Sequence, residues 1–123
     1  MRTFIAALVV STFSGFWAGS VAALDSSLGS LKVDAMVTGL DQPWAVAFLP
    51  GGSLLITERD GRLIHVSGNQ ITEVLGVPDV ADSGQGGLLD VLVPRDFAQT
   101  REIFLSFAKA QGRGSGTALA RGT

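Results

Sequence analysis

The chain has 123 residues, a formal net charge of -2, 46% hydrophobic and 16% charged residues, and no cysteine. This length allows one domain at most, and the high apolar content excludes an intrinsically disordered chain. The few, scattered basic residues exclude a nucleic-acid-binding surface, and the lack of cysteine excludes disulfides and thiolate metal sites.

The first 23 residues have the layout of a secretory signal peptide. Arg2 supplies a positive start, an apolar run follows over residues 4–10, and small residues lead up to Ala23. We predict cleavage after Ala23, which leaves no membrane span and places the mature protein in the periplasm or outside the cell. The alternative is an uncleaved anchor helix, which the serines and glycines interrupting the apolar stretch disfavour.

Residues 24–32 are polar and serine-rich, and we predict a flexible linker there. From residue 33 to residue 123 the chain alternates short apolar runs with turn residues, which predicts one all-β domain without a helix. Asp60-Gly61 between two apolar runs is the strongest hairpin signal in the chain. The expected strands up to residue 75 are 33–38, 44–49, 53–57, 62–66 and 71–75, and the last four predict an antiparallel meander.

The strand pattern then starts again, with runs over residues 88–93 and 103–108 and another beginning at 117–120. Pro94 follows the first of these runs as Pro50 follows the run 44–49, at an offset of 44 residues. A period in the low forties with four strands per repeat is typical of a propeller blade. A β-sandwich with evenly spaced strands is the alternative, and spacing alone favours neither.

Fewer than two blades cannot cover both of their apolar faces. The propeller interpretation therefore predicts that this chain supplies only the first one to two blades of a gene product several times longer. On its own, such a piece is expected to be unstable or to aggregate.

The most unusual stretch is the glycine-rich segment 82–87, in which three glycines flank Gln85. Glycine permits a close approach of a ligand to the backbone, and a glutamine amide both donates and accepts hydrogen bonds. This combination suits a planar polar cofactor, and an ordinary loop between blades is the alternative. A phosphate-binding loop is disfavoured because no Lys-Ser/Thr pair follows and no helix begins there.

Other polar residues carry weaker signals. His65 is the only histidine, lies within a predicted strand, and is interpreted as structural. Asp90 interrupts an apolar run, and a carboxylate buried there would need a partner, so it ranks second after Gln85. Trp44 is interpreted as blade core, although it could stack on a sugar. The charges around the Asp60-Gly61 turn, which are Glu58, Arg59, Asp60 and Arg62, are interpreted as solvating the turn, although they could form a ligand-facing ion pair.

Three ordered blocks resemble the glucose/sorbosone dehydrogenase family of soluble aldose dehydrogenases that use pyrroloquinoline quinone (PQQ). The blocks are residues 39–52, residues 55–63, and residues 84–91 followed by Asp96-Phe97. The resemblance covers about residues 37–121 and implies a six-bladed propeller. It departs from the pattern at residues 93–97, where many members have His-Pro-Asp-Phe, and this weakly favours a broad-specificity aldose dehydrogenase.

The resemblance also implies a chemistry. In the family the quinone is held with Ca²⁺, and a histidine removes a proton from the sugar's anomeric hydroxyl as hydride passes to the quinone, which an external acceptor reoxidises. Gln85 matches the glutamine that approaches the quinone, so it is the one residue predicted to bind cofactor. His65 does not match the catalytic histidine, so we assign no catalytic residue and no metal ligand.

The sequence therefore favours a PQQ-dependent enzyme that oxidises aldose sugars to lactones, of which this chain alone is expected to be inactive. The alternative is a non-catalytic propeller that binds carbohydrate or protein. A third hypothesis, a lactonase-type propeller, would need metal-binding carboxylates and an asparagine at its axis.

Overall fold

The computed structural model describes residues 24–123, and the predicted signal peptide lies outside the described residues. Among the described residues, those up to Met36 and those from Val37 to Thr123 belong to separate units. The described part of the first unit contains an antiparallel hairpin of β1 (Leu24–Ser26) and β2 (Gly29–Leu31). The Ser26 hydroxyl donates to the Gly29 carbonyl at 2.6 Å and closes its turn. The segment predicted as a flexible linker thus carries a short hairpin.

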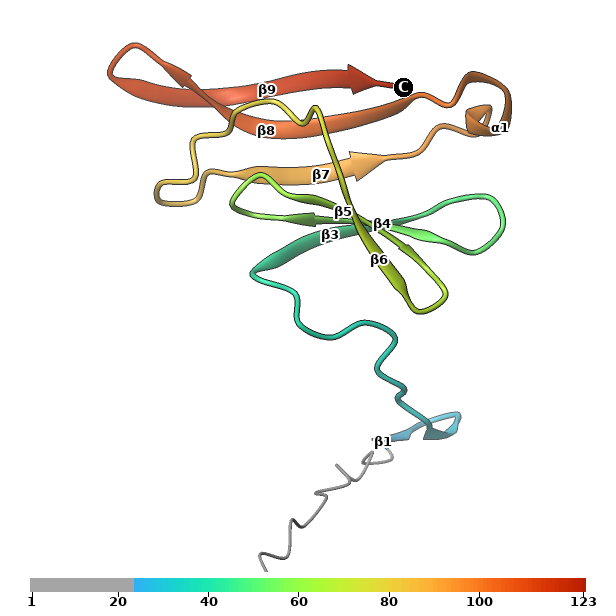
Figure 1. The fold of residues 1–123 in the computed structure, drawn as a ribbon. Coiled ribbons are helices and arrows are strands. Elements are labelled where there is room, and N and C mark those ends of the chain that lie inside the picture. Colours follow the sequence, from blue (N-terminus) through green and yellow to red (C-terminus); the bar gives the residue numbers. More distant parts are fainter. Residues whose placement is uncertain (1–23) are drawn as a thin grey trace, which may run out of the picture. The chain divides into compact units, whose positions relative to one another are not determined.

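The second unit begins with a four-stranded antiparallel sheet (Figure 1). Its strands follow the chain order and each pairs with the next, as expected for a meander. The four strands predicted between residues 44 and 75 are thereby confirmed. They are β3 (Pro43–Phe48), β4 (Leu54–Glu58), β5 (Leu63–Ser67) and β6 (Gln70–Val74).

The β4–β5 connection forms at the predicted Asp60-Gly61 turn. Glu58 N–H donates to the Arg62 carbonyl at 2.8 Å, and Gly61 N–H donates to the Glu58 carbonyl at 3.1 Å. Gly61 has φ of +110°, which other residues rarely adopt, so the glycine fits the sharp reversal. The turn projects Arg59 and Arg62 from the end of the sheet, where the candidate site forms.

A three-stranded antiparallel sheet follows, with strand order β7-β8-β9. Its strands are β7 (Leu88–Leu92), β8 (Ile103–Gln111) and β9 (Gly114–Gly122). The second set of predicted strands is confirmed, although β8 and β9 run further than predicted. The prediction of no helix was wrong for residues 97–100: α1 (Phe97–Thr100) makes a single turn, and its Phe97 side chain is buried.

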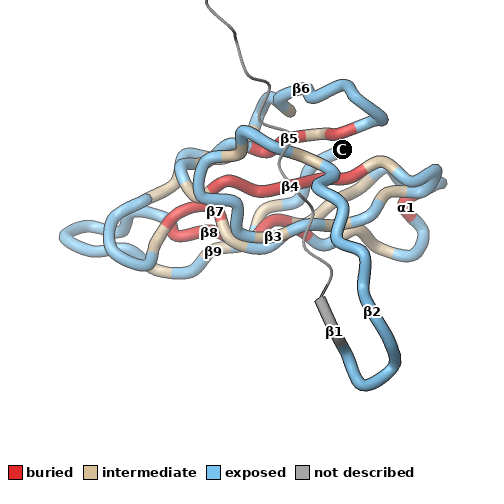
Figure 2. Tube along the Cα trace, turned by 90° about the horizontal axis from the view of Figure 1, so that it is seen from below, coloured by how far each residue is buried: buried red, intermediate tan, exposed pale blue. Residues whose placement is uncertain are grey.

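The two sheets pack through β7, which lies against β3 and β4. The core between them is formed by Leu55 and Leu63 of the first sheet and by side chains of the second, which are Leu88, Val91, Leu105 and Phe107. Thr57 joins the sheets directly: its hydroxyl accepts from Ala45 N–H at 3.0 Å and donates to the Leu89 carbonyl at 2.6 Å. Figure 2 shows that the buried stretches follow β4, β5, β7 and β8.

The other face of the first sheet carries a second, smaller apolar cluster of Leu54, Ile56, Ile64 and Val66. Val37 and Leu40 pack on this cluster from the segment that precedes β3. β4 is therefore buried on both faces, which explains why its sequence is almost continuously apolar.

Two sequence predictions fail on this same face. Residues 33–38 form no strand among the described residues, and Val37, where the second unit begins, packs on the cluster instead. Trp44 is 53% exposed and is not part of the core. Val46 and Phe48 are also exposed, although their strand partners Ile56 and Leu54 are buried.

Candidate functional site

Three chain segments meet where β4 ends and β7 begins. Arg59 N–H donates to the Gln42 carbonyl at 3.2 Å, and the Arg59 carbonyl accepts from Leu88 N–H at 3.0 Å. The backbone of one turn residue thus fixes both the residue before β3 and the first residue of β7. The glycine-rich segment singled out in the sequence ends at this junction.

We define the glycine-rich loop as residues 82–87. Its base is closed by one residue of β8, because Ala108 N–H donates to the Gly87 carbonyl at 2.8 Å and the Ala108 carbonyl accepts from Ala81 N–H at 2.8 Å. Within the loop, Gly86 N–H donates to the Ser83 carbonyl at 3.0 Å. The loop is therefore anchored to the second sheet at both ends.

The Arg59 side chain occupies the inside of this loop. Its Nε donates to the Gly86 carbonyl at 3.0 Å, and its Nη2 donates to the Gly84 carbonyl at 2.7 Å and to the Asp82 carbonyl. Its Nη1 donates to Gln42 Oε1 at 3.0 Å. Charge-assisted hydrogen bonds of this kind are about twice as strong as neutral ones, so the guanidinium is the main tie inside the loop.

The closeness of the loop to Arg59 requires glycine at residue 87. A Cβ on Gly87 would overlap the Arg59 carbonyl oxygen, and its φ of +126° is rarely adopted by other residues. Gly84 differs from Gly87, because a Cβ there would meet open space. The sequence suggested that these glycines let a ligand come close to the backbone. At least Gly87 is instead needed for the fold of the loop itself.

Gln85, the predicted cofactor-binding residue, is exposed at the tip of the loop. Because C=O and N–H point in opposite directions across a trans peptide, carbonyls turned toward Arg59 direct the next N–H groups away from it. These are the amides of Ser83 and Gln85. The loop therefore offers outward backbone donors beside a side-chain amide, an arrangement suited to an acceptor-rich ligand.

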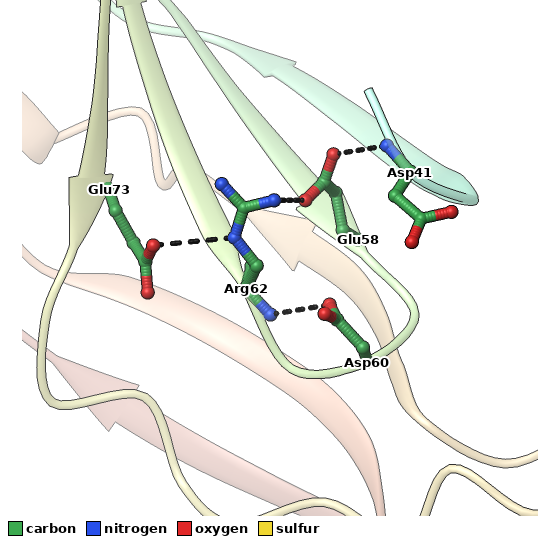
Figure 3. A network of polar contacts seen from close by, with 5 residues as sticks. All are labelled: Asp41, Glu58, Asp60, Arg62 and Glu73. Carbon is green, nitrogen blue, oxygen red and sulfur yellow. Dashed lines mark hydrogen bonds and ion pairs between the residues drawn. The ribbon is translucent and has the colours of Figure 1, made fainter. Parts of the chain in front are cut away.

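A second polar group lies on the same turn, and Figure 3 shows its members. We call it the Glu58 cluster, after a carboxylate that is 1% exposed and that accepts from Arg62 Nη1 and from Asp41 N–H, both at 2.6 Å. Arg62 Nε also pairs with Glu73 at 3.3 Å. The hydrogen bond to Glu73 and the charge of Glu58 raise the pKa of Arg62. The cluster contains Asp41, Glu58, Asp60, Arg62 and Glu73.

The remaining sequence candidates lie elsewhere. His65 is half-buried on β5 and lines a cavity of about 470 Å³, mostly apolar, whose lining includes Thr72 and Arg101 but neither Gln85 nor Arg59. Asp90 is exposed, so the expectation of a buried carboxylate was wrong. It sits in a β-bulge of β7, where its carboxylate accepts from Val91 N–H at 2.9 Å.

Sequence reasoning missed Arg59 and Glu58 by treating them as solvating charges. A usable signal was present, since both follow directly after the continuously apolar run of β4, where a charged side chain needs partners. Over residues 24–123, no three His, Cys, Asp or Glu side chains lie close enough to hold a metal ion. Among the same residues, no helix is long and apolar enough to cross a membrane.

The comparisons with known proteins agree on one kind of protein. The family model described as Glucose / Sorbosone dehydrogenase matches residues 40–123. The chain is 45% identical over 104 residues to "Aldose sugar dehydrogenase YliI" of Escherichia coli K12, covering 81% of this chain but 28% of that protein.

Solved structures give the same result. A glucose dehydrogenase superposes with a TM-score of 0.69 at 45% identity, over 72% of this chain and 29% of that one. The PQQ-bound form of an aldose sugar dehydrogenase from Streptomyces coelicolor matches with a TM-score of 0.65 at 33% identity, over 72% of this chain and 26% of its own. The predicted fold class, part of an all-β propeller, is thereby confirmed.

Proposed function

Because the chain belongs to the glucose/sorbosone dehydrogenase family, we propose that its complete gene product, called here the whole protein, oxidises aldose sugars with PQQ as cofactor. The relatives named as aldose sugar and glucose dehydrogenases support a sugar oxidoreductase, and one of them was solved with PQQ. The chain spans less than three tenths of these relatives' lengths, so the activity belongs to the whole protein.

The observation that carries the proposal is the exposure of Gln85 on a loop whose backbone is held from within. PQQ is planar and rich in carbonyl and carboxylate oxygens, which need donors. Gln85 and the outward amide of its own residue supply donors, and the guanidinium of Arg59 adds positive charge behind them. The residues present therefore fit such a ligand, and we propose that Gln85 contacts it.

When bound, the quinone supplies the two-electron acceptor for hydride from the sugar carbon, so that the anomeric hydroxyl becomes a lactone carbonyl. The part of this chain in that reaction is orientation: Gln85 fixes one edge of the cofactor by hydrogen bonding. We propose that the general base, the Ca²⁺ ligands and the docking surface for an external electron acceptor belong to other segments of the whole protein. Residues 24–123 prepared alone are accordingly expected to show no turnover.

We also propose that the protein is exported and works in the periplasm or outside the cell. The sequence pattern of residues 1–23 supports this, with cleavage after Ala23. N-terminal sequencing of the protein recovered from the periplasm or the medium is expected to begin at Leu24. Recovery of a protein that still begins at Met1 in a membrane fraction would contradict cleavage and support the anchor helix.

The enzymatic proposal is tested with the whole protein, purified without cofactor and titrated with PQQ in the presence of Ca²⁺. Reduction of an electron-accepting dye by glucose and other aldoses is the activity readout. We expect dye reduction that depends on PQQ, and weaker PQQ binding in Gln85→Ala than in the matched variant Gln99→Ala, which changes an exposed glutamine of α1. No dye reduction by a folded, PQQ-titrated protein would contradict the proposal.

A further inference from the structure

We propose that Arg59 is the positioning residue that sets the shape of the glycine-rich loop and thereby holds Gln85 in place for the cofactor. The inference rests on the proposed quinone contact of Gln85. Arg59 itself is not assigned a contact with the cofactor, since the four hydrogen bonds that its side chain donates all go to protein acceptors. It acts through the loop.

The glycine-rich loop surrounds the guanidinium of Arg59 with its backbone carbonyls. The acceptors are carbonyls of alternate residues, Asp82, Gly84 and Gly86, so the backbone turns the same edge inward three times. Each inward carbonyl directs the following amide outward. The direction in which Gln85 presents its backbone donor is thus a consequence of where Arg59 lies.

Arginine suits this place better than any other side chain. Its planar fork carries five N–H donors in fixed directions, and here Nε and both terminal nitrogens are used. Lysine carries three donors at one point and cannot reach acceptors spread along a loop in the same way. Among residues 24–123 no carboxylate lies within ion-pair distance of Arg59, so its charge is met by carbonyl dipoles.

The loop has little else to hold its tip. Gly84 and Gly86 lack side chains, and glycine-rich backbone loses more conformational entropy on ordering than any other. The base, in contrast, is held by Ala108 through both its N–H and its carbonyl. Removing the guanidinium should therefore release the tip with Gln85 while the base and the two sheets stay folded.

Hydrogen exchange of the quinone-free whole protein, resolved to single amides, tests the first half of the inference. The Gly86 amide reports on the tip, because it donates to Ser83 within the loop, and the Ala81 amide reports on the base. In Arg59→Ala we expect exchange at Gly86 to accelerate at least about tenfold and exchange at Ala81 to change much less. The matched control is Arg62→Ala, which removes an arginine of the same turn that does not touch the loop.

Quinone affinity tests the second half, in a cycle of Arg59→Ala, Gln85→Ala and the double variant. We expect about tenfold to a hundredfold weaker PQQ binding for Arg59→Ala, with little further loss when Gln85 is already alanine. Arg59→Lys is expected to leave most of the loss in place, because charge without the fork does not rebuild the loop. Should Arg59→Ala not accumulate, Arg59→Gln serves in the same cycle.

Unchanged exchange at Gly86 in a folded Arg59 variant would overturn the inference. So would full recovery of affinity by Arg59→Lys, or losses from Arg59→Ala and Gln85→Ala that simply add. If Gln85→Ala binds PQQ as tightly as the wild type while Gly86 exchange still accelerates in Arg59→Ala, the quinone contact of Gln85 fails. Arg59 then orders the loop, but the role assigned to it through Gln85 is overturned.

Discussion

Arg59 and Arg62 leave the same turn and meet different kinds of partner. Arg62 lies among carboxylates in the Glu58 cluster, and Arg59 lies among backbone carbonyls in the glycine-rich loop. The first arrangement fastens the turn to its own sheet and to Asp41, whereas the second fastens a separate loop that carries Gln85. Two arginines of one turn can therefore have different roles, with Arg62 supporting the fold and Arg59 supporting the candidate site.

The physical difference lies in what each arginine leaves behind when it is removed. Without Arg62, the buried carboxylate of Glu58 is expected to keep only the Asp41 amide as its hydrogen-bond donor. Without Arg59, three carbonyls of one loop lose their common donor at once. We therefore expect the Glu58 cluster to govern stability and the Arg59 contacts to govern the order of the loop.

The largest effect on stability is expected from Gly87→Ala, which disturbs the backbone of the glycine-rich loop. The added Cβ would overlap the Arg59 carbonyl in a backbone conformation that alanine avoids. We expect the free energy of unfolding to fall by about 3 kcal/mol, measured by denaturant titration of the whole protein. Gly84→Ala is the control, with a loss of about 1 kcal/mol, since its φ is positive but its Cβ would meet open space. Equal losses would show that Arg59 and the loop do not pack closely.

Glu58→Gln is expected to come second and to act on stability alone. The variant keeps the shape of the side chain but replaces its charged hydrogen bonds to Arg62 and Asp41 by neutral ones. We expect a loss of about 1–2 kcal/mol in the free energy of unfolding. Asp60→Asn, which keeps an oxygen facing Arg62 N–H, should change it by less than about 0.5 kcal/mol.

The same Glu58→Gln variant sharpens the comparison through a second readout. Its exchange rate at the Gly86 amide should stay within about twofold of the wild type, since no contact of Glu58 reaches the loop. Faster exchange at Gly86 would show that the Glu58 cluster and the glycine-rich loop are coupled.

The same contrast explains how much could be predicted from the sequence. The meander from β3 to β6 was predictable, because Asp60-Gly61 and the other turn residues divide apolar runs of strand length. The position of Gln85 on a glycine-rich loop was predictable too. The position after an apolar run signals that Arg59 needs partners, but not that it lies inside the loop, because three of its four side-chain acceptors are backbone carbonyls, which every residue carries.

The predictions for Trp44 and Asp90 failed because the surroundings of these residues in the fold differ from what their sequence neighbours indicate. Trp44 is a large apolar residue within a dense strand, but it is half exposed and belongs to neither apolar cluster. Asp90 interrupts an apolar run, yet a bulge turns it outward, and a bulge depends on the register between two strands. Both outcomes depend on residues far away in the chain, which a local pattern does not contain.

A smaller effect is expected from Glu73→Gln at the outer edge of the Glu58 cluster. The pair with Arg62 is about half exposed on both sides, so water and salt screen it. We expect a loss of roughly 0–1 kcal/mol in the free energy of unfolding at low salt, which vanishes in 1 M salt, about where screening is complete. The loss from Glu58→Gln should persist in high salt because Glu58 is buried, and a loss that salt removes from both variants alike would contradict this ranking.

The smallest expected effect concerns pH, because the charge of Arg62 should give the stability no pH dependence near neutrality. Its pKa is raised in the folded state, first by the hydrogen bond to Glu73 and then by the charge of Glu58. A raised pKa means that the contribution of Arg62 to the free energy of unfolding is fully present below its pKa in the unfolded state. This contribution is lost only as the pH rises through its pKa in the folded state. That window lies in strongly alkaline solution, so the difference in unfolding free energy between the wild type and Arg62→Gln should be constant between about pH 7 and pH 9. Thermal unfolding across that range checks this, and a difference that slopes with pH would mean that the cluster is held by a group other than Arg62.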